Sequence, residues 1–387
     1  MRSIELFSGC GGLALGLSMA GFRHEMMVEW NNDACSTIFH NRRLGVDHVA
    51  HWPIRHADVR GIDWSEVGNE LHLVAGGPPC QPFSIGGKHT GNEDSRDMWP
   101  QAIRAVRELM PNGFVFENVK GLLRPVFSDY LNWITSHLAL PHLERAENET
   151  YQEHLIRLGR NLDEAVYDVR ILKVNAADYG VAQKRHRVII FGVRRDLNIP
   201  ITLLQPTHSR ERLLWDQWVT GHYWARHGIS VPPDSQIPTS DNLMVQKLRK
   251  QNTPPAHSPW ATVRDALHGL GEPNGKMNHN LQEGARVYTG HTGCPLDQPA
   301  KALKAGAHGV PGGENMMVRD DGTVRYFTVR EAARLQGLPD EYTFPGSWTE
   351  SMRQLGNAVP VKLAQAVGNM MATMLEQDEA ILFRNAA

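Results

Sequence analysis

Short apolar runs alternate with helix-like segments along the first two hundred residues of the chain. Residues 4–7, 24–28, 71–74, 114–116 and 188–191 have the length and apolar character of buried strands. Helices are expected between them, over about residues 13–20 and 98–110. Short apolar strands separated by helices are typical of a doubly wound α/β fold with a mostly parallel sheet.

The pattern changes after Asp196. From residue 199 to about residue 322 the chain is rich in Pro, Gly, His and Trp, and its apolar positions show little periodicity. Regular helices are expected again over residues 329–336 and 361–375. We therefore predict a first domain over 1–195, a smaller irregular insert over 196–324, and a segment over 325–387 that returns to the first domain.

The composition is that of an ordinary soluble globular protein, with 41% hydrophobic and 21% charged residues among 387. The longest apolar run, residues 188–191, is too short to span a membrane, so no membrane partner is expected. The N-terminal residues lack the layout of a signal peptide. The four cysteines show no paired spacing, which favours a reducing, cytoplasmic location.

The net charge of −2 counts mildly against a nucleic-acid partner, but the charges are unevenly distributed. Seven Lys or Arg residues lie between Lys184 and Arg212, against Asp196 and Glu211. This stretch predicts a basic cleft that could meet phosphate, although a mixed, solvated surface would give the same composition. The histidines His48, His51 and His56 have no Cys or acidic residue at ligand spacing, so no metal site is expected.

A glycine-rich run, Phe7-Ser8-Gly9-Cys10-Gly11-Gly12, directly follows the first predicted strand. Glycines allow a sharp turn and a close approach to a ligand. Glu29 comes seventeen residues after Gly12, where an acidic side chain could bind ribose hydroxyls. Asp58 could lie at the end of a further strand and bond an adenine amino group, although an isolated Asp in a loop is usually solvated. A tight turn in any α/β protein, a dehydrogenase included, fits this run equally well.

Cys80 lies in the run Gly-Gly-Pro-Pro-Cys-Gln-Pro over residues 76–82, directly after a predicted strand. Its thiol is therefore expected at the carboxyl end of the sheet, where such folds bind ligands. Prolines 78, 79 and 82 stiffen the backbone and can fix a reactive side chain. An isolated cysteine is more often a small buried hydrophobe, but this setting makes burial in a regular element improbable and favours a nucleophile.

Two further sets of polar residues lie next to predicted strands. Glu117 ends the predicted strand 114–116, where desolvation would favour its protonated form and suit it to donate a proton to a ring nitrogen. A glutamate that caps the next helix is nearly as good an interpretation. Gln183, Arg185 and Arg187 alternate before the strand 188–191, so they are expected to share one face and to grip phosphate or a base carbonyl. A basic edge strand would explain their charge alone.

Together with Gly-Asn-Ala-Val-Pro at 356–360, these segments occur in a fixed order that resembles the cytosine-C5 DNA methyltransferase family, bacterial or phage type. The match covers roughly the first 195 and the last 65 residues. The resemblance implies a Rossmann-like fold, S-adenosylmethionine held by the glycine run, and a cytosine flipped out of the duplex. The expected site residues are Cys80, Glu117, Arg185 and Arg187 for catalysis, Phe7, Ser8, Gly9, Gly11, Gly12, Glu29, Trp30, Asp58, Val59, Pro79, Asn357 and Val359 for the cofactor, and Gln81, Ser84 and Gln183 for the substrate.

The resemblance also implies that the insert is a target recognition domain and that the substrate is double-stranded DNA. A monomer is expected, as is a cognate restriction endonuclease if the enzyme belongs to a restriction–modification system. Residues 84–96, with Gly86, Gly87 and Gly91, are our candidate for a mobile lid. Residues 137–167 form an extra helical excursion whose role stays open.

Three rival interpretations remain at this point. A tRNA cytosine-C5 methyltransferase would carry the same motifs, although the long insert favours the reading of a duplex site. A nicotinamide-dependent oxidoreductase would explain the glycine run but not the Pro-Cys-Gln and Gln-x-Arg-x-Arg segments. A catalytically silent DNA-binding module is disfavoured because none of the expected active-site residues is replaced.

Overall fold

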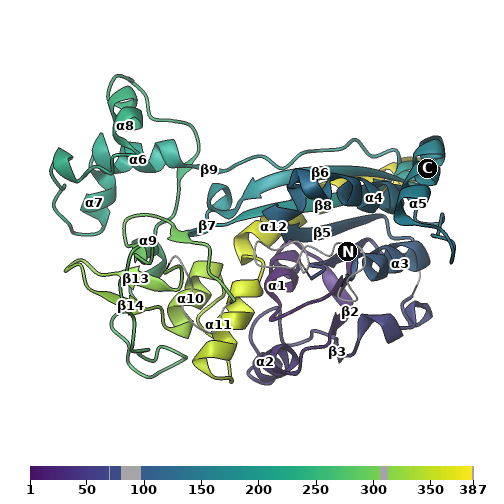
Figure 1. Cartoon of the computed structure of the whole chain (residues 1–387), viewed down its shortest axis with the longest axis horizontal. Coiled ribbons are helices and arrows are strands. Elements are labelled where there is room, and N and C mark those ends of the chain that lie inside the picture. Colours follow the sequence, from purple (N-terminus) through teal and green to yellow (C-terminus); the bar gives the residue numbers. More distant parts are fainter. Residues whose placement is uncertain (69, 80–96, 306–312, 386–387) are drawn as a thin grey trace. The chain divides into compact units, whose positions relative to one another are not determined.

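The computed structural model describes residues 1–68, 70–79, 97–305 and 313–385, with side chains as far as Glu376 (Figure 1). The chain divides into two compact units. The sheet unit comprises Met1–Val174, His186–Leu204 and Glu341–Ala387, and the insert unit comprises Asn175–Arg185 and Gln205–Asp340. The predicted domain limits lay at 195/196 and 324/325. The observed units differ from them in three places, because residues 175–185 and 325–340 lie in the insert unit and residues 196–204 lie in the sheet unit.

The sheet unit is built on a seven-stranded sheet with the order β3-β2-β1-β4-β5-β8-β6. Pairing is parallel from β3 to β5, and β8 runs antiparallel to β5. The mostly parallel sheet is therefore confirmed. The strands are β1 (Arg2–Leu6), β2 (Arg23–Glu29), β3 (Ile54–His56), β4 (Leu73–Gly76), β5 (Gly113–Val119), β6 (Tyr167–Asn175) and β8 (His186–Arg194).

The sheet unit contains the helices that the apolar periodicity predicts, together with further helices. The predicted helices 13–20, 98–110 and 361–375 are observed as α1, α3 and the longer α12. The full set is α1 (Gly12–Met19), α2 (Asn32–Arg43), α3 (Trp99–Leu109), α4 (Ser128–Ala139), α5 (Tyr151–Arg160), α11 (Trp348–Asn357) and α12 (Val361–Asn385). Helix α5 is the helical part of the predicted excursion.

Strand β5 shows how alternation builds the two faces of this sheet. Phe114 and Phe116 are fully buried in one apolar cluster with residues of α3 and α4. Gly113 points to the opposite face, where an added Cβ would lie 2.8 Å from Cε of Met371 in α12. Because residues alternate along a strand, the side chain of Glu117 belongs to the same face as Gly113.

Helices α1 and α12 pack against each other through glycine (Figure 1). A Cβ at Gly16 of α1 would lie 2.3 Å from Cβ of Ala364, and one at Gly368 of α12 would lie 2.7 Å from Cβ of Ala20. Such distances are far below van der Waals contact, so the close approach of the two helices depends on the missing side chains. This packing fixes the start of α1, which directly follows the glycine-rich run.

The insert unit contains short helices and strands of two or three residues, which is why its sequence shows so little periodicity. Trp215, Trp218 and Trp224 lie in a buried cluster of this unit. The helices are α6 (Arg210–Trp218), α7 (His222–Arg226), α8 (Asn242–Leu248), α9 (Val263–Leu267) and α10 (Val329–Gln336). The strands are β7 (Gln183–Lys184), β9 (His208–Ser209), β10 (Ser258–Pro259), β11 (Cys294–Pro295), β12 (Ala300–Lys301), β13 (Met316–Val318) and β14 (Val324–Tyr326).

Candidate active site

The glycine-rich run forms a turn in the left-handed region of backbone space. Phe7 has a φ of 57° although it carries a side chain, and Gly9 has a φ of 53°. A non-glycine residue held in this conformation is strained and is often found at functional sites. An added Cβ at Gly9 would meet nothing within 4 Å, so this side of the turn is open for a ligand. Ser8 is buried, and its hydroxyl donates to the carbonyls of Glu5 and Val28, both at 3.4 Å.

The other two glycines of the run are required for packing inside the sheet unit. A Cβ at Gly11 would lie 2.3 Å from the indole of Trp52, and one at Gly12 would lie 2.4 Å from the carbonyl oxygen of Val359. The predicted cofactor residues Gly12 and Val359 are thus brought together by direct contact. Their proximity supports a common cofactor site. The contact between Gly12 and the carbonyl oxygen of Val359 is also part of the packing of the sheet unit.

Glu29 is buried at the end of β2, beside the turn. One carboxylate oxygen accepts from the amide of Gly9 at 2.8 Å, and the other accepts from the amides of Trp30 and Asn31 at 3.0 and 2.8 Å. Three backbone donors explain how a carboxylate can be buried here. They also leave lone pairs on both oxygens, so the predicted ribose contact stays compatible with the structure.

Trp30 and Asp58 lie on the surface beyond the sheet edge. The side chain of Trp30 is 71% exposed, which is unusual for an indole and leaves its face open to a planar ligand. Asp58 forms an ion pair with Arg60, and hydrogen bonds from this arginine lower the pKa of the carboxyl. Asp58 also caps the short 3-10 helix that begins at Val59, which is buried. The predicted contact between Asp58 and an adenine remains a prediction.

For a helix expected from Val361, Asn357 is a reasonable cap, but in the structure it is the last residue of the preceding helix α11. The amide of Ala358 still donates to the carbonyl of Gln354 at 3.0 Å, so the α11 hydrogen-bond pattern runs past Asn357. Ala358 then turns to an extended backbone, and α12 begins after Pro360. The correction arises because α11 has no strong sequence signal of its own. The side chain of Asn357 is exposed.

Glu117 lies inside β5, which continues to Val119, and not at the end of a strand as predicted. Its side chain is almost fully buried at the carboxyl end of β4. A Cβ at Gly77 would lie 3.6 Å from Oε2 of Glu117. The neighbouring Asn118 donates from Nδ2 to the carbonyl of Pro78 at 3.1 Å. Strand β5 therefore holds the backbone that leads from β4 into the Pro-Cys-Gln segment.

Arg187, on β8, forms an ion pair with Glu117. Its Nε lies 2.5 Å from Oε1 of the carboxylate, and the two side chains are only 12% and 10% exposed. Neither of these two atoms is aligned for a hydrogen bond, although Nη1 of Arg187 donates to the carbonyl of His186 at 2.8 Å. The antiparallel register of β5 and β8 creates this meeting, because Arg187 pairs with Val119, two residues beyond Glu117. Mutual neutralisation explains how both charges can be buried.

Gln183 and Arg185 are placed differently from Arg187. The prediction of one strand with all three residues on one face is wrong, because β7 ends at Lys184 and pairs with β12. The amide of Arg185 donates to the side-chain Oδ1 of Asn175, the last residue of β6, at 3.1 Å, and its carbonyl accepts from the amide of Ala176, so its backbone makes no strand pairing here.

The side chains of Gln183 and Arg185 are buried in the insert unit. Oε1 of Gln183 accepts from the amide of Leu303 at 3.0 Å, and Nη1 of Arg185 donates to the carbonyl of the same Leu303 at 3.0 Å. Gln183 and Arg185 thus form one group in the insert unit, and Glu117 and Arg187 form another in the sheet unit.

The basic stretch from Lys184 to Arg212 does not form an open charged face. Four of its seven cations are engaged in ion pairs, namely Arg187, Arg194, Arg210 and Arg212. Arg185 is 1% exposed. The prediction of a basic cleft is therefore wrong for this stretch, because most of its positive charges are buried or neutralised by ion pairs within the protein.

Cys80, Gln81 and Ser84 lie outside the described residues, as does the whole of the predicted lid over 84–96. Pro79, the last described residue before them, is exposed. The description resumes at Asp97, whose Oδ1 accepts from the amide of Trp99 at 3.0 Å at the start of α3. The role of Cys80 as the nucleophile stays a prediction.

Sequence reasoning missed one residue of the site, Asn118. Its side chain is 1% exposed, and its bond to Pro78 joins the strand of the expected acid to the segment of the expected nucleophile. The signal was present, because a buried amide directly after Glu117 needs partners at the same sheet edge.

Comparison with known proteins identifies the family of this chain. A family model described as C-5 cytosine-specific DNA methylase matches residues 1–140 and 143–373, and the chain belongs to this family. The enzyme is a DNA (cytosine-5-)-methyltransferase, and its methyl donor is S-adenosylmethionine. The exposed indole of Trp30 and the open side of Gly9 beside Glu29 fit a nucleoside-bearing donor.

Individual relatives are similar in sequence over nearly the whole length of this chain. The chain is 30% identical to the Type II methyltransferase M.NgoMIV of Neisseria gonorrhoeae, over 97% of this chain and 98% of the relative. It is 31% identical to the Type II methyltransferase M.Eco47II of Escherichia coli, over 97% and 79%. The crystal structure of a DNMT2 mutant from Spodoptera frugiperda has the same fold, with a TM-score of 0.56 and 17% identity, over 96% of this chain and 99% of that one. In the described part of the chain, no helix is long and apolar enough to cross a membrane.

Proposed function

We propose that this enzyme methylates one cytosine within a specific double-stranded DNA site, as the modification partner of a restriction endonuclease. Cys80 is the nucleophile, Glu117 is the acid, and Arg185 and Arg187 hold the base. The observation that carries the proposal is the pair of contacts from β5 to the segment before Cys80. Asn118 bonds Pro78 at 3.1 Å, and the Glu117 carboxylate lies over Gly77.

The chemistry follows from the weak nucleophilicity of cytosine C5. Attack of the Cys80 thiolate on C6 makes an electron-rich enamine at C5. Glu117 protonates N3 as the C6–S bond forms, which neutralises the charge that develops on the ring. S-adenosylmethionine, when bound, supplies the electrophilic methyl group. A solvent base then takes the C5 proton, which re-forms the C5–C6 double bond and expels the thiolate of Cys80, and the proton on N3 returns to Glu117.

The buried ion pair with Glu117 supports a base-holding role for Arg187. Its guanidinium is held beside the Glu117 carboxylate at the sheet edge, so it is preorganised to meet the base oxygen on the same edge. Arg185, Gln81, Ser84 and Gln183 would complete the contacts to the flipped base. A stacked duplex keeps C6 out of reach, so the cytosine has to leave the helix before the thiolate attacks.

The insert, residues 196–324, is proposed to be the target recognition domain, because a duplex site needs a sizeable reading element. Names of relatives at about 30% identity support the restriction–modification setting, since they are Type II methyltransferases. A cytoplasmic monomer that acts with a cognate endonuclease is part of the same proposal.

The deciding experiment expresses the protein in cells that lack cytosine methylation and sequences their bisulfite-treated DNA. We expect one short motif in which a single cytosine is protected in every copy. Label transfer from radioactive S-adenosylmethionine to plasmid DNA and to tRNA is measured in parallel. Label in tRNA with none in DNA would refute the proposal in favour of an RNA methyltransferase.

A duplex of the identified site with 5-fluorocytosine at the target tests the nucleophile, because fluorine blocks the loss of the C5 substituent. A covalent complex should form with the wild-type enzyme and with Cys35→Ala, a buried cysteine outside the mechanism. It should be absent with Cys80→Ala. A complex that forms without Cys80 would remove this residue from the mechanism.

A further inference from the structure

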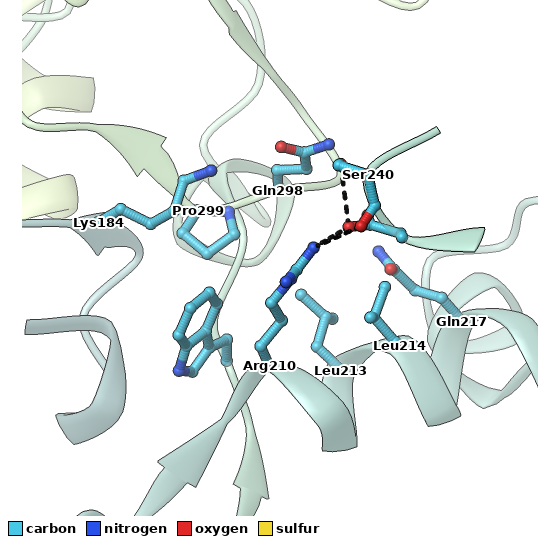
Figure 2. A pocket seen from close by; sticks show the side chains of 10 residues that line it. Lys184, Arg210, Leu213, Leu214, Gln217, Ser240, Gln298 and Pro299 are labelled. Atoms are coloured by element: carbon cyan, nitrogen blue, oxygen red, sulfur yellow. Dashed lines mark hydrogen bonds and ion pairs between the residues drawn. The ribbon is translucent and has the colours of Figure 1, made fainter. Parts of the chain in front are cut away.

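The insert unit contains a cavity of about 300 Å³ that none of the proposed catalytic contacts uses (Figure 2). Its lining comes from α6, the end of β7, the segment before α8, the residue after β10 and the segment before β12. The lining side chains that carry the argument are Lys184, Arg210, Asp241, Trp260, Gln298 and Pro299.

One wall of this cavity is held by its own charges. Arg210, the first residue of α6, forms an ion pair with the buried Asp241, and the hydroxyl of Ser240 donates to the same carboxylate at 3.2 Å. The guanidinium also reaches the carbonyl of Ser240 at 3.4 Å. Figure 2 shows the guanidinium of Arg210 between Pro299 on one side and Gln217 on the other. This wall is therefore rigid and close to neutral.

The opposite wall carries polar groups without such partners. Within the described part of the chain, Lys184 forms no ion pair and Gln298 makes no side-chain hydrogen bond, and Figure 2 shows both beside Pro299. Burial, followed by the positive charge of Arg210, lowers the pKa of Lys184. Two cations thus face one carboxylate, which leaves the cavity with a net positive charge and an unused amide.

The remaining wall is apolar and flat. The indole of Trp260 is fixed by a hydrogen bond from Nε1 to Oδ1 of Asp178 at 2.9 Å, and Leu213 and Leu214 of α6 flank it. A fixed indole beside an unneutralised cation matches a ligand that is aromatic at one end and anionic at the other. A nucleotide has this chemistry, with a base for the indole and amide and a phosphate for the lysine.

The chain itself connects this cavity to the DNA substrate. Lys184 stands between Gln183 and Arg185, which the proposed function places around the flipped cytosine. Successive residues of a strand face opposite sides, and Gln183 is buried toward α10 while Lys184 faces the cavity. The cavity is at the small end of ligand sites and cannot admit a base pair, so only an unstacked nucleotide can enter it.

We propose that this cavity receives one nucleotide of the bound DNA that has left the base stack, other than the target cytosine. Its phosphate pairs with Lys184, and its base lies against Trp260 and bonds Gln298. The inference rests on the proposed function, because it takes the substrate to be DNA.

The test uses duplexes of the site found by bisulfite sequencing, with 2-aminopurine placed in turn at the target and at each neighbouring position. Unstacking raises the fluorescence of this base. We expect a rise at the target and at one further position. Lys184→Ala and Gln298→Ala should abolish the second rise and keep the first, and Lys250→Ala, an exposed lysine of the same unit, should keep both.

Affinity gives an independent readout. Lys184→Ala is expected to raise the Kd for the duplex roughly tenfold and to lower the slope of log Kd against log salt by about one, as the loss of one phosphate contact requires. Lys250→Ala should change neither quantity. Free deoxynucleotide monophosphates are titrated as a second arm, to separate a nucleotide of the DNA from a free nucleotide.

Three outcomes would overturn the proposal: fluorescence that rises only at the target, an affinity of Lys184→Ala equal to that of wild type, or a free nucleotide that binds through Lys184 without changing DNA affinity. Each leaves the target signal and methyl transfer intact. Failure of the proposed function would instead abolish transfer to DNA in the wild-type enzyme, so the two failures are distinguishable.

Discussion

Replacing Gly16 by alanine should destabilise this protein, although alanine is the better helix former. The exchange lowers the backbone entropy cost by about 0.5–1 kcal/mol. The new Cβ would lie 2.3 Å from Cβ of Ala364, 2.5 Å from the amide nitrogen of Gln365 and 2.6 Å from the carbonyl oxygen of Val361. Two of these atoms are backbone, so α12 has to move, which costs about 1–3 kcal/mol. We expect a net loss of about 1–2 kcal/mol.

Gly159 provides the matched control, because it also lies in a helix but a Cβ there would meet nothing within 4 Å. Gly159→Ala should stabilise by about 0.5–1 kcal/mol through the entropy effect alone. Urea titration followed by circular dichroism gives both free energies of unfolding. Calorimetric titration of S-adenosylmethionine should show weaker binding for Gly16→Ala only, since α12 follows Val359, which contacts Gly12. Equal stabilisation by both substitutions would refute the packing argument.

Three further substitutions test the site and its surroundings. Glu117→Gln should slow methyl transfer by about 10²–10⁴-fold in single-turnover assays, with an unchanged Kd for the cofactor, because the acid is lost; unchanged transfer would exclude Glu117 as the acid. Trp30→Ala should weaken cofactor binding by about 3–10-fold in calorimetry without changing stability, since the indole is 71% exposed; an unaltered Kd would argue against stacking. Burial lowers the pKa of His137 to about 3. Between pH 6.5 and pH 3 the unfolded chain therefore binds one proton more than the folded chain. The free energy of unfolding then falls with falling pH by up to about 1.4 kcal/mol per pH unit. His137→Phe should flatten this acid slope in urea titrations, and the exposed His51→Ala should leave it; equal slopes would contradict the assignment.

The sheet unit could be predicted from the sequence because its elements are long enough to show a period. The apolar runs at β1, β2, β4, β5 and β8 marked a mostly parallel sheet, and the glycine and proline turns marked its carboxyl edge. Glu117 was found for the same reason, although β5 continues beyond it.

The insert unit could not be predicted in the same way. Strands such as β7 and β12 have two residues each, too few for any periodicity, and only their tertiary pairing defines them. The seven cations from Lys184 to Arg212 looked like an exposed cluster because most of their acidic partners are distant in sequence. Arg187 pairs with Glu117 and Arg210 with Asp241, whereas of these three arginines only Arg212 has a nearby partner, Asp216.

The insert unit has one consequence for protein engineering. Its fold takes in residues 175–185, which precede the rest of the unit by a full strand, and Ala300 pairs with Gln183 across β12 and β7. A graft that moves residues 205–340 alone into a relative would separate these partners. Leu303 would then pack against the relative's own residues at positions 183 and 185 in place of Gln183 and Arg185. Exchanging this unit with that of a relative therefore needs two more crossovers than exchanging residues 205–340 alone, so that residues 175–185 move together with the segment they fold against.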